Sequence, residues 1–135
     1  MTSKKNSILN ISLWIAQVLL SIMFVMAGFI KLSQSISELS VSLPWVTKTP
    51  ELLIRFIGLS ELLGGIGLIL PALLRILPKL TAFAGIGIAT IMVLATFYHA
   101  YRGEYSSVVF NFLLLGMAIF VAWGRLKKAP IEPKK

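Results

Sequence analysis

A single carboxylate interrupts a long apolar stretch near the middle of the sequence. Glu61 lies in GLSELLGGIGLILP, residues 58–71, where it is the only charged residue. An unpaired charge is costly both at the centre of a membrane and in the core of a buried helix. We therefore expect Glu61 to have an oppositely charged partner, to be protonated, or to serve a function such as binding a ligand or a proton.

Depth along the apolar segments indicates which polar side chains can meet Glu61. Helical rise places Glu61 about 14 Å from the start of its segment, near the midplane of a membrane. Four other polar residues fall in the same, outer half of their segments, whereas Gln17 falls in the inner half. These positions predict an outer-facing polar pocket with Glu61 at its floor and a candidate ligand-binding or polar network of Glu61, Lys31, His99, Asn111 and Arg55.

Several of these side chains also have a purely structural explanation. Arg55 is six residues from Glu61, so the two do not face each other on one helix. Lys31 at a helix end is ordinarily expected to extend toward the lipid headgroups, although a close helix contact at Gly28 would carry it inward. His99 is either a hydrated interfacial residue or, with its near-neutral titration, part of a proton relay. The cluster as a whole is either a ligand, proton or partner site or a buried network that only fixes packing.

Small residues predict which side of the Glu61 segment faces protein. Gly58, Glu61 and Gly65 follow one helical stripe, and glycine lets membrane helices approach closely. Glu61 is therefore expected to face neighbouring helices. Gln17 and Asn111 are expected to bridge helices by hydrogen bonds.

The residue types exclude several chemistries. The chain has no cysteine and a single histidine, so thiol redox catalysis, iron–sulfur ligation and a multi-histidine metal site cannot be built within it. We find no autonomous catalytic constellation, assign no catalytic or metal-ligating residue, and expect no cofactor.

The composition indicates a membrane protein. Of 135 residues, 57% are hydrophobic and only 13% are charged, and a chain this short cannot hide so much apolar surface from water. Apolar segments at about 8–31, 52–74, 80–101 and 105–124 approach or exceed the roughly 20 residues of a membrane-spanning helix. The expected fold is all-α, a four-helix transmembrane bundle forming a single domain over residues 1–135.

Two segments outside the apolar spans, residues 33–51 and 125–135, also carry predictions. In residues 33–51, Ile36, Leu39 and Leu43 have helical spacing, which predicts either a short amphipathic surface helix ended by Pro44 or an ordinary loop. Residues 125–135 are predicted to be a disordered basic tail that touches anionic lipid.

The charges predict the topology. The net charge of +8 does not indicate nucleic-acid binding, since no basic stripe with interleaved aromatic residues is present. With four spans, nine cations share the side of the two termini and four share the other, so the positive-inside rule places both termini in the cytoplasm. We expect an uncleaved first segment and a multi-pass protein of the bacterial cytoplasmic membrane. The nine cations are Lys4, Lys5, Arg75, Lys79, Arg125, Lys127, Lys128, Lys134 and Lys135.

Several motifs in order along the chain resemble the DoxX-like family of integral membrane proteins. They are FVMAGFIKL at the end of the first segment, FIGLSELLGGIGLILP in the second, the histidine ending the third, and WGR ending the fourth. The resemblance implies a compact four-helix membrane bundle. It implies little about activity, although some members of the wider group are linked to quinone-coupled oxidation of sulfur compounds or to membrane complexes handling oxidative stress.

These observations favour a non-catalytic bundle that binds a lipophilic small molecule or a protein partner through a pocket at Glu61. The alternative, motivated by the resemblance, is a quinone-interacting subunit of a membrane oxidoreductase complex, in which Glu61 or His99 would exchange protons with the quinone. A small transporter is a lesser alternative, since no inverted repeat is visible. The expected partners are membrane lipids, a protein of a membrane complex or further copies of the chain, and not nucleic acid.

Overall fold

The described part of the chain forms four long apolar helices, two short helical segments and a π-helical turn. The computed structural model describes residues 3–134, with side chains from residue 7 onward. The long helices are α1 (Ser3–Ser33), α3 (Glu51–Leu74), α4 (Lys79–Tyr101) and α5 (Tyr105–Trp123). Each is long and apolar enough to cross a membrane. The prediction of an all-α chain with four candidate spans is confirmed.

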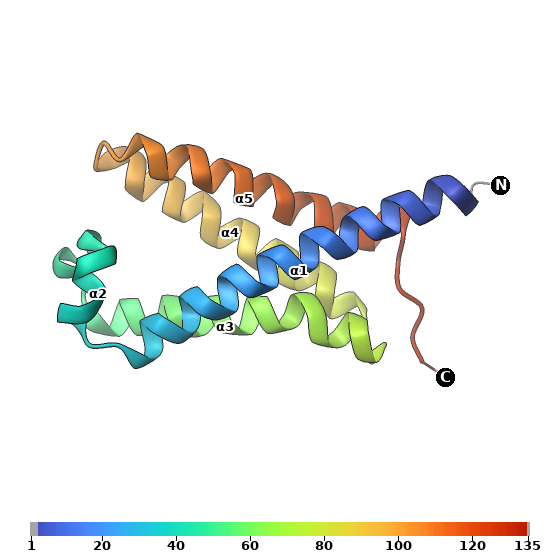
Figure 1. Cartoon of the computed structure of the whole chain (residues 1–135), viewed down its shortest axis with the longest axis horizontal. Coiled ribbons are helices and arrows are strands. Elements are labelled where there is room, and N and C mark those ends of the chain that lie inside the picture. Colours follow the sequence, from blue (N-terminus) through green and yellow to red (C-terminus); the bar gives the residue numbers. More distant parts are fainter. Residues whose placement is uncertain (1–2, 135) are drawn as a thin grey trace.

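The long helices pack as two antiparallel pairs, α1 with α3 and α4 with α5, and α3 also packs on α4. Figure 1 shows the pairs close together toward the end of the chain termini and separated toward α2. The shared core joins buried side chains of all four helices. Most of the remaining surface is apolar, which suits a lipid environment. The core includes Leu20, Phe24, Leu68, Ile88 and Leu114.

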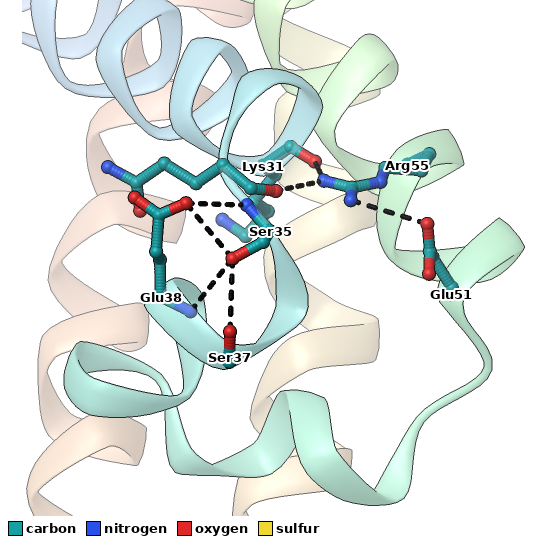
Figure 2. A network of polar contacts seen from close by, with 7 residues as sticks. Lys31, Ser35, Ser37, Glu38, Glu51 and Arg55 are labelled. Atoms are coloured by element: carbon teal, nitrogen blue, oxygen red, sulfur yellow. Dashed lines mark hydrogen bonds and ion pairs between the residues drawn. The ribbon is translucent and has the colours of Figure 1, made fainter.

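Two short helical segments cover the end where the pairs separate. α2 (Ile36–Ser42) begins at a capping box, in which the Ser35 side chain accepts from the Glu38 N–H and the Glu38 carboxylate accepts from the Ser35 N–H (Figure 2). The 3₁₀ segment η1 (Pro44–Lys48) follows directly. Leu39, Val46 and Ile54 form a fully buried cluster that fastens both segments to α3. Of the two alternatives for this connection, a short helix before Pro44 or an ordinary loop, the structure has the short helix.

The prediction of a disordered tail over residues 125–135 is wrong for residues 125–128. The π-helical turn η2 (Gly124–Lys128) continues α5, and the Ala129 N–H donates to the Gly124 carbonyl at 2.7 Å. Arg125 is only 4% exposed, because its guanidinium is held between helices rather than released to the headgroups. The helical turn ends before Pro130, which has no N–H to continue it.

Both ends of the described chain lie at the same end of the bundle (Figure 1). The Lys134 N–H donates to the Arg75 carbonyl at 2.8 Å, and Arg75 Nε donates to the Glu132 carbonyl at 2.8 Å. The final segment is thus fastened to the α3–α4 connection. We call this the termini end, and the opposite end, where α2 and η1 lie, the capped end.

Candidate functional site

Glu61 lies on the face of α3 that packs against α1. Gly58, Glu61 and Gly65 are all buried, so the predicted protein-facing glycine stripe is confirmed. A Cβ added to Gly65 would lie 2.8 Å from Val25 Cγ2 and 2.9 Å from the Val25 nitrogen. Glycine is therefore what allows α1 and α3 to touch along this stripe.

Lys31 is the partner of Glu61. Its Nζ lies 2.7 Å from Glu61 Oε1, and the two residues are 7% and 5% exposed. The expectation that Lys31 extends to the headgroups is wrong. A Cβ on Gly28 would lie 2.5 Å from the Gly58 carbonyl oxygen, so the backbones of α1 and α3 nearly meet there and direct Lys31 toward Glu61.

Arg55 supports this pair indirectly. Its Nη1 donates at 2.7 Å to the carbonyls of Lys31 and Gln34, and its Nη2 lies 3.3 Å from Glu51 Oε2 (Figure 2). As predicted, it does not pair with Glu61. The guanidinium instead satisfies carbonyls at the end of α1, which have no partner within the helix. Arg55 thereby fixes the backbone that carries Lys31.

His99 belongs to a separate polar group at the capped end. Its Nδ1 lies 2.7 Å from Glu104 Oε1, which also accepts from Arg102 Nε at 3.1 Å. Hydrogen bonds from His99 and then from Arg102 hold the pKa of Glu104 below its usual value, and the bond to Glu104 raises the pKa of Arg102. The His99 ring also packs edge-on against Trp45 and Tyr98. A direct bond to Glu61, which a proton relay would use, is not formed.

Gln17 and Asn111 were both expected to bridge helices, and only Gln17 does. Gln17 Nε2 donates to the Leu68 carbonyl at 2.7 Å, joining α1 to α3. Asn111 is 8% exposed, and its Nδ2 has no hydrogen-bond partner among the described residues. A buried donor without a partner is uncommon and calls for an explanation.

Four of the five candidate residues line one cavity of about 550 Å³. Lys31 and Glu61 contribute from the α1–α3 pair, and His99 and Asn111 contribute from α4 and α5. Trp45 and Thr49, beside the capped end, complete the wall. Arg55 lies outside it. The rest of the lining is mainly aliphatic and aromatic, including Phe24, Phe56, Ile57, Met92 and Leu114.

The lining of this cavity sets a few polar groups among apolar side chains. Among the described side chains, no three histidine, cysteine or acidic groups gather closely enough to hold a metal ion. The cavity is lined by the Lys31–Glu61 ion pair, the Asn111 side chain and the His99 imidazole, with apolar side chains around them.

A second buried polar group, near the termini end, was not anticipated from the sequence. Arg125 Nε donates to Gln17 Oε1 at 2.7 Å, and Arg125 Nη1 donates at 2.7 Å to Asn10 Oδ1. The available signal was the spacing of Asn10 and Gln17, seven residues apart on one helical face. A second signal was the glycine directly before Arg125 in the sequence. The structure explains it, because a Cβ at Gly124 would collide with the Leu13 side chain.

The fold and these sites define a small all-helical membrane protein with polar groups enclosed at both ends. The model of the DoxX-like family matches residues 15–121, which covers most of the chain. The protein therefore belongs to the DoxX-like family. No curated protein and no solved structure matches the chain.

Proposed function

We propose that this DoxX-like protein is a non-catalytic bundle that binds a lipophilic small molecule in the cavity at Lys31 and Glu61. One observation carries the proposal: a mainly apolar cavity of about 550 Å³ is lined by an ion pair and by the Asn111 amide, whose Nδ2 has no hydrogen-bond partner among the described residues. Ligand pockets span roughly 300–1,000 Å³ and combine apolar walls with a few placed polar groups. The size and lining of this cavity fall within that description.

The polar groups indicate the kind of head group. The Lys31 ammonium and the Glu61 carboxylate neutralise each other at 2.7 Å, so the cavity gains polarity without net charge. An unsatisfied buried donor costs about 1–3 kcal/mol, and a ligand oxygen would remove that cost once the Asn111 amide turned toward the cavity. An uncharged head group with a hydrogen-bond acceptor fits both features. The ligand's apolar part would contact the aromatic and aliphatic walls.

The proposed orientation places the termini end in the cytoplasm. Within the described chain this end carries most of the cations, including Arg75, Lys79, Lys127 and Lys128, and one acid, Glu132. The positive-inside rule then puts the capped end and the cavity in the outer half of the membrane.

A quinone is the alternative ligand. Glu61 and His99 both line the cavity, and either could exchange a proton with a quinone head group. Solvent extraction of the purified protein tests this directly. Absence of quinone, with unchanged quinone-linked rates in membranes lacking the protein, would reject the alternative and leave the broader binding proposal standing.

Native mass spectrometry after gentle extraction tests the main proposal. We expect the wild-type protein to retain a small lipophilic molecule, and Ala95→Phe, which fills the cavity from α4, to release it. Val93→Phe adds an aromatic ring on the same helix at an exposed position outside the lining, so it should retain the molecule. Equal retention by both variants, or no retained molecule in the wild type, would contradict the proposal.

A further inference from the structure

A second cavity, of about 590 Å³, lies at the termini end. Its wall combines Asn10 and Trp14 of α1 with Arg75 at the end of α3 and with residues 128–131 that follow α5. Hydrogen bonds between Arg75 and the final segment hold this wall together. The cavity is separate from the one at Glu61, and the proposed function does not use it.

The wall of this cavity is positively charged. Arg75 and Lys128 line it, and its lining includes no acidic residue. Arg75 uses Nε for the Glu132 carbonyl, and the Lys128 ammonium lies 5.9 Å from the centre of the Trp123 ring. Neither cation forms an ion pair with a carboxylate among the described residues. Both are exposed and can turn toward an anion.

Arg125 adds a buried charge directly behind this wall. Its Nη1 donates to Asn10 and to the Ala129 carbonyl, and its guanidinium lies 5.5 Å from the centre of the Trp14 ring. All three contacts are with residues that line the cavity. Its Nη2 is buried and has no partner among the described residues. Two cations therefore line the cavity, and a third, held in place by hydrogen bonds, lies behind its wall.

We propose that this cavity binds the phosphate diester of an anionic phospholipid. Arg75 and Lys128 would contact the phosphate, and Arg125 would add to the local positive potential. Basic pockets between membrane helices on the cytoplasmic side are suited to anionic head groups. Phosphate recognition by arginine adds directed hydrogen bonds to the charge attraction.

The position of the cavity favours a lipid over a soluble phosphate. It lies where α1, α3 and α5 reach the end of their apolar spans. Leu73 and Ile131 line it beside the charged groups, and Trp14 supplies an amphipathic ring of the type enriched at membrane interfaces. An acyl chain can leave the cavity along the exposed apolar surface of α1, at Ile11 and Ile15.

Lipid retention measured by native mass spectrometry tests the proposal. The full-length protein would be titrated in neutral detergent with phosphatidylglycerol and, separately, with phosphatidylcholine. We expect one phosphatidylglycerol to bind preferentially, and Arg75→Gln combined with Lys128→Gln to weaken it about 30-fold, the size expected from removing two cations near an anionic lipid. The matched control, Lys79→Gln combined with Lys127→Gln, removes two exposed cations at the same end from outside the cavity and should bind as the wild type does.

Three outcomes would overturn the proposal. Equal weakening in both double variants would show a diffuse charge effect rather than a site, and no weakening in either would show that these cations do not bind the lipid. Competition by glycerol phosphate at the concentration of the lipid would identify a soluble phosphate instead. Circular dichroism melts of both double variants establish that any loss comes from a folded protein.

Discussion

The Lys31–Glu61 pair can contribute to structure, to binding, or to both, and single substitutions separate these roles poorly. Both side chains are almost completely buried. Removing one partner leaves an uncompensated charge, whereas replacing both by apolar residues removes the charge altogether. The double replacement is therefore the variant that can stay folded and still report on the site.

We expect Glu61→Gln to lower the free energy of unfolding by about 3–5 kcal/mol, since Lys31 would stay buried without a counter-charge. Lys31→Met combined with Glu61→Leu should recover most of that loss. Reversible unfolding in mixed detergent measures both variants. If the pair also serves ligand binding, the double variant will be stable but will not retain the ligand; ligand retention equal to wild type would make the pair purely structural.

The Glu104 carboxylate gives the capped end a dependence on pH. Its pKa is lowered from the ordinary value of 4.5 by hydrogen bonds first from His99 and then from Arg102. A lowered pKa means that the folded state prefers the charged form, so the stabilisation is present above about pH 4.5 and disappears as pH falls through the lower, folded-state pKa.

We therefore expect the thermal midpoint of the wild type to fall below pH 4.5 more steeply than that of Glu104→Gln. Melting curves between pH 7 and pH 3 in one detergent make the comparison. Parallel curves across the whole range would show that Glu104 contributes no pH-dependent stability.

At the scale of the helices, close backbone approach is what brings the site together. A Cβ on Gly28 would lie 2.5 Å from the Gly58 carbonyl oxygen and 2.5 Å from the Leu62 nitrogen, both backbone atoms that cannot turn aside. A side chain at this position must push α1 and α3 apart. Since Lys31 lies one turn further along α1, the same displacement would lengthen its contact with Glu61.

Gly28→Ala should consequently destabilise the protein by about 1–3 kcal/mol, as overpacking does in tightly packed interiors. Gly116→Ala is the matched control, because a Cβ there meets nothing within 4 Å. In a helix it should be neutral or stabilise by up to about 1 kcal/mol. Unfolding measurements on both variants test the contact, and equal stability would mean that α1 and α3 have room to adjust at no cost.

At the scale of the whole molecule, the hydrophobic pattern predicted the helices well because lipid requires long apolar segments. The fourth span, predicted at 105–124, agrees with α5, but its continuation as η2 to Lys128 was not predicted. In the sequence, the buried Arg125 looks like a cation at a membrane boundary. Helix depth correctly placed Lys31, Glu61, His99 and Asn111 toward the same end of the bundle, where they line one cavity. Which of them pair could not be predicted, because pairing depends on helix rotation and on the backbone contact at Gly28.

The orientation of the molecule in the membrane is open to a direct test, because the natural chain contains no cysteine. Two exposed positions mark the two ends of the bundle: Ser37 on α2 and Lys127 near the termini end. Each would be replaced singly by cysteine. If the positive-inside rule holds, a membrane-impermeant maleimide added to intact cells or spheroplasts will label Ser37→Cys and not Lys127→Cys, and disruption of the membrane will expose Lys127→Cys. The cysteine-free parent controls for background labelling. The reverse pattern would place the Glu61 cavity in the cytoplasmic half, so that its ligand would enter from the inner leaflet and the basic cavity would face the outer one.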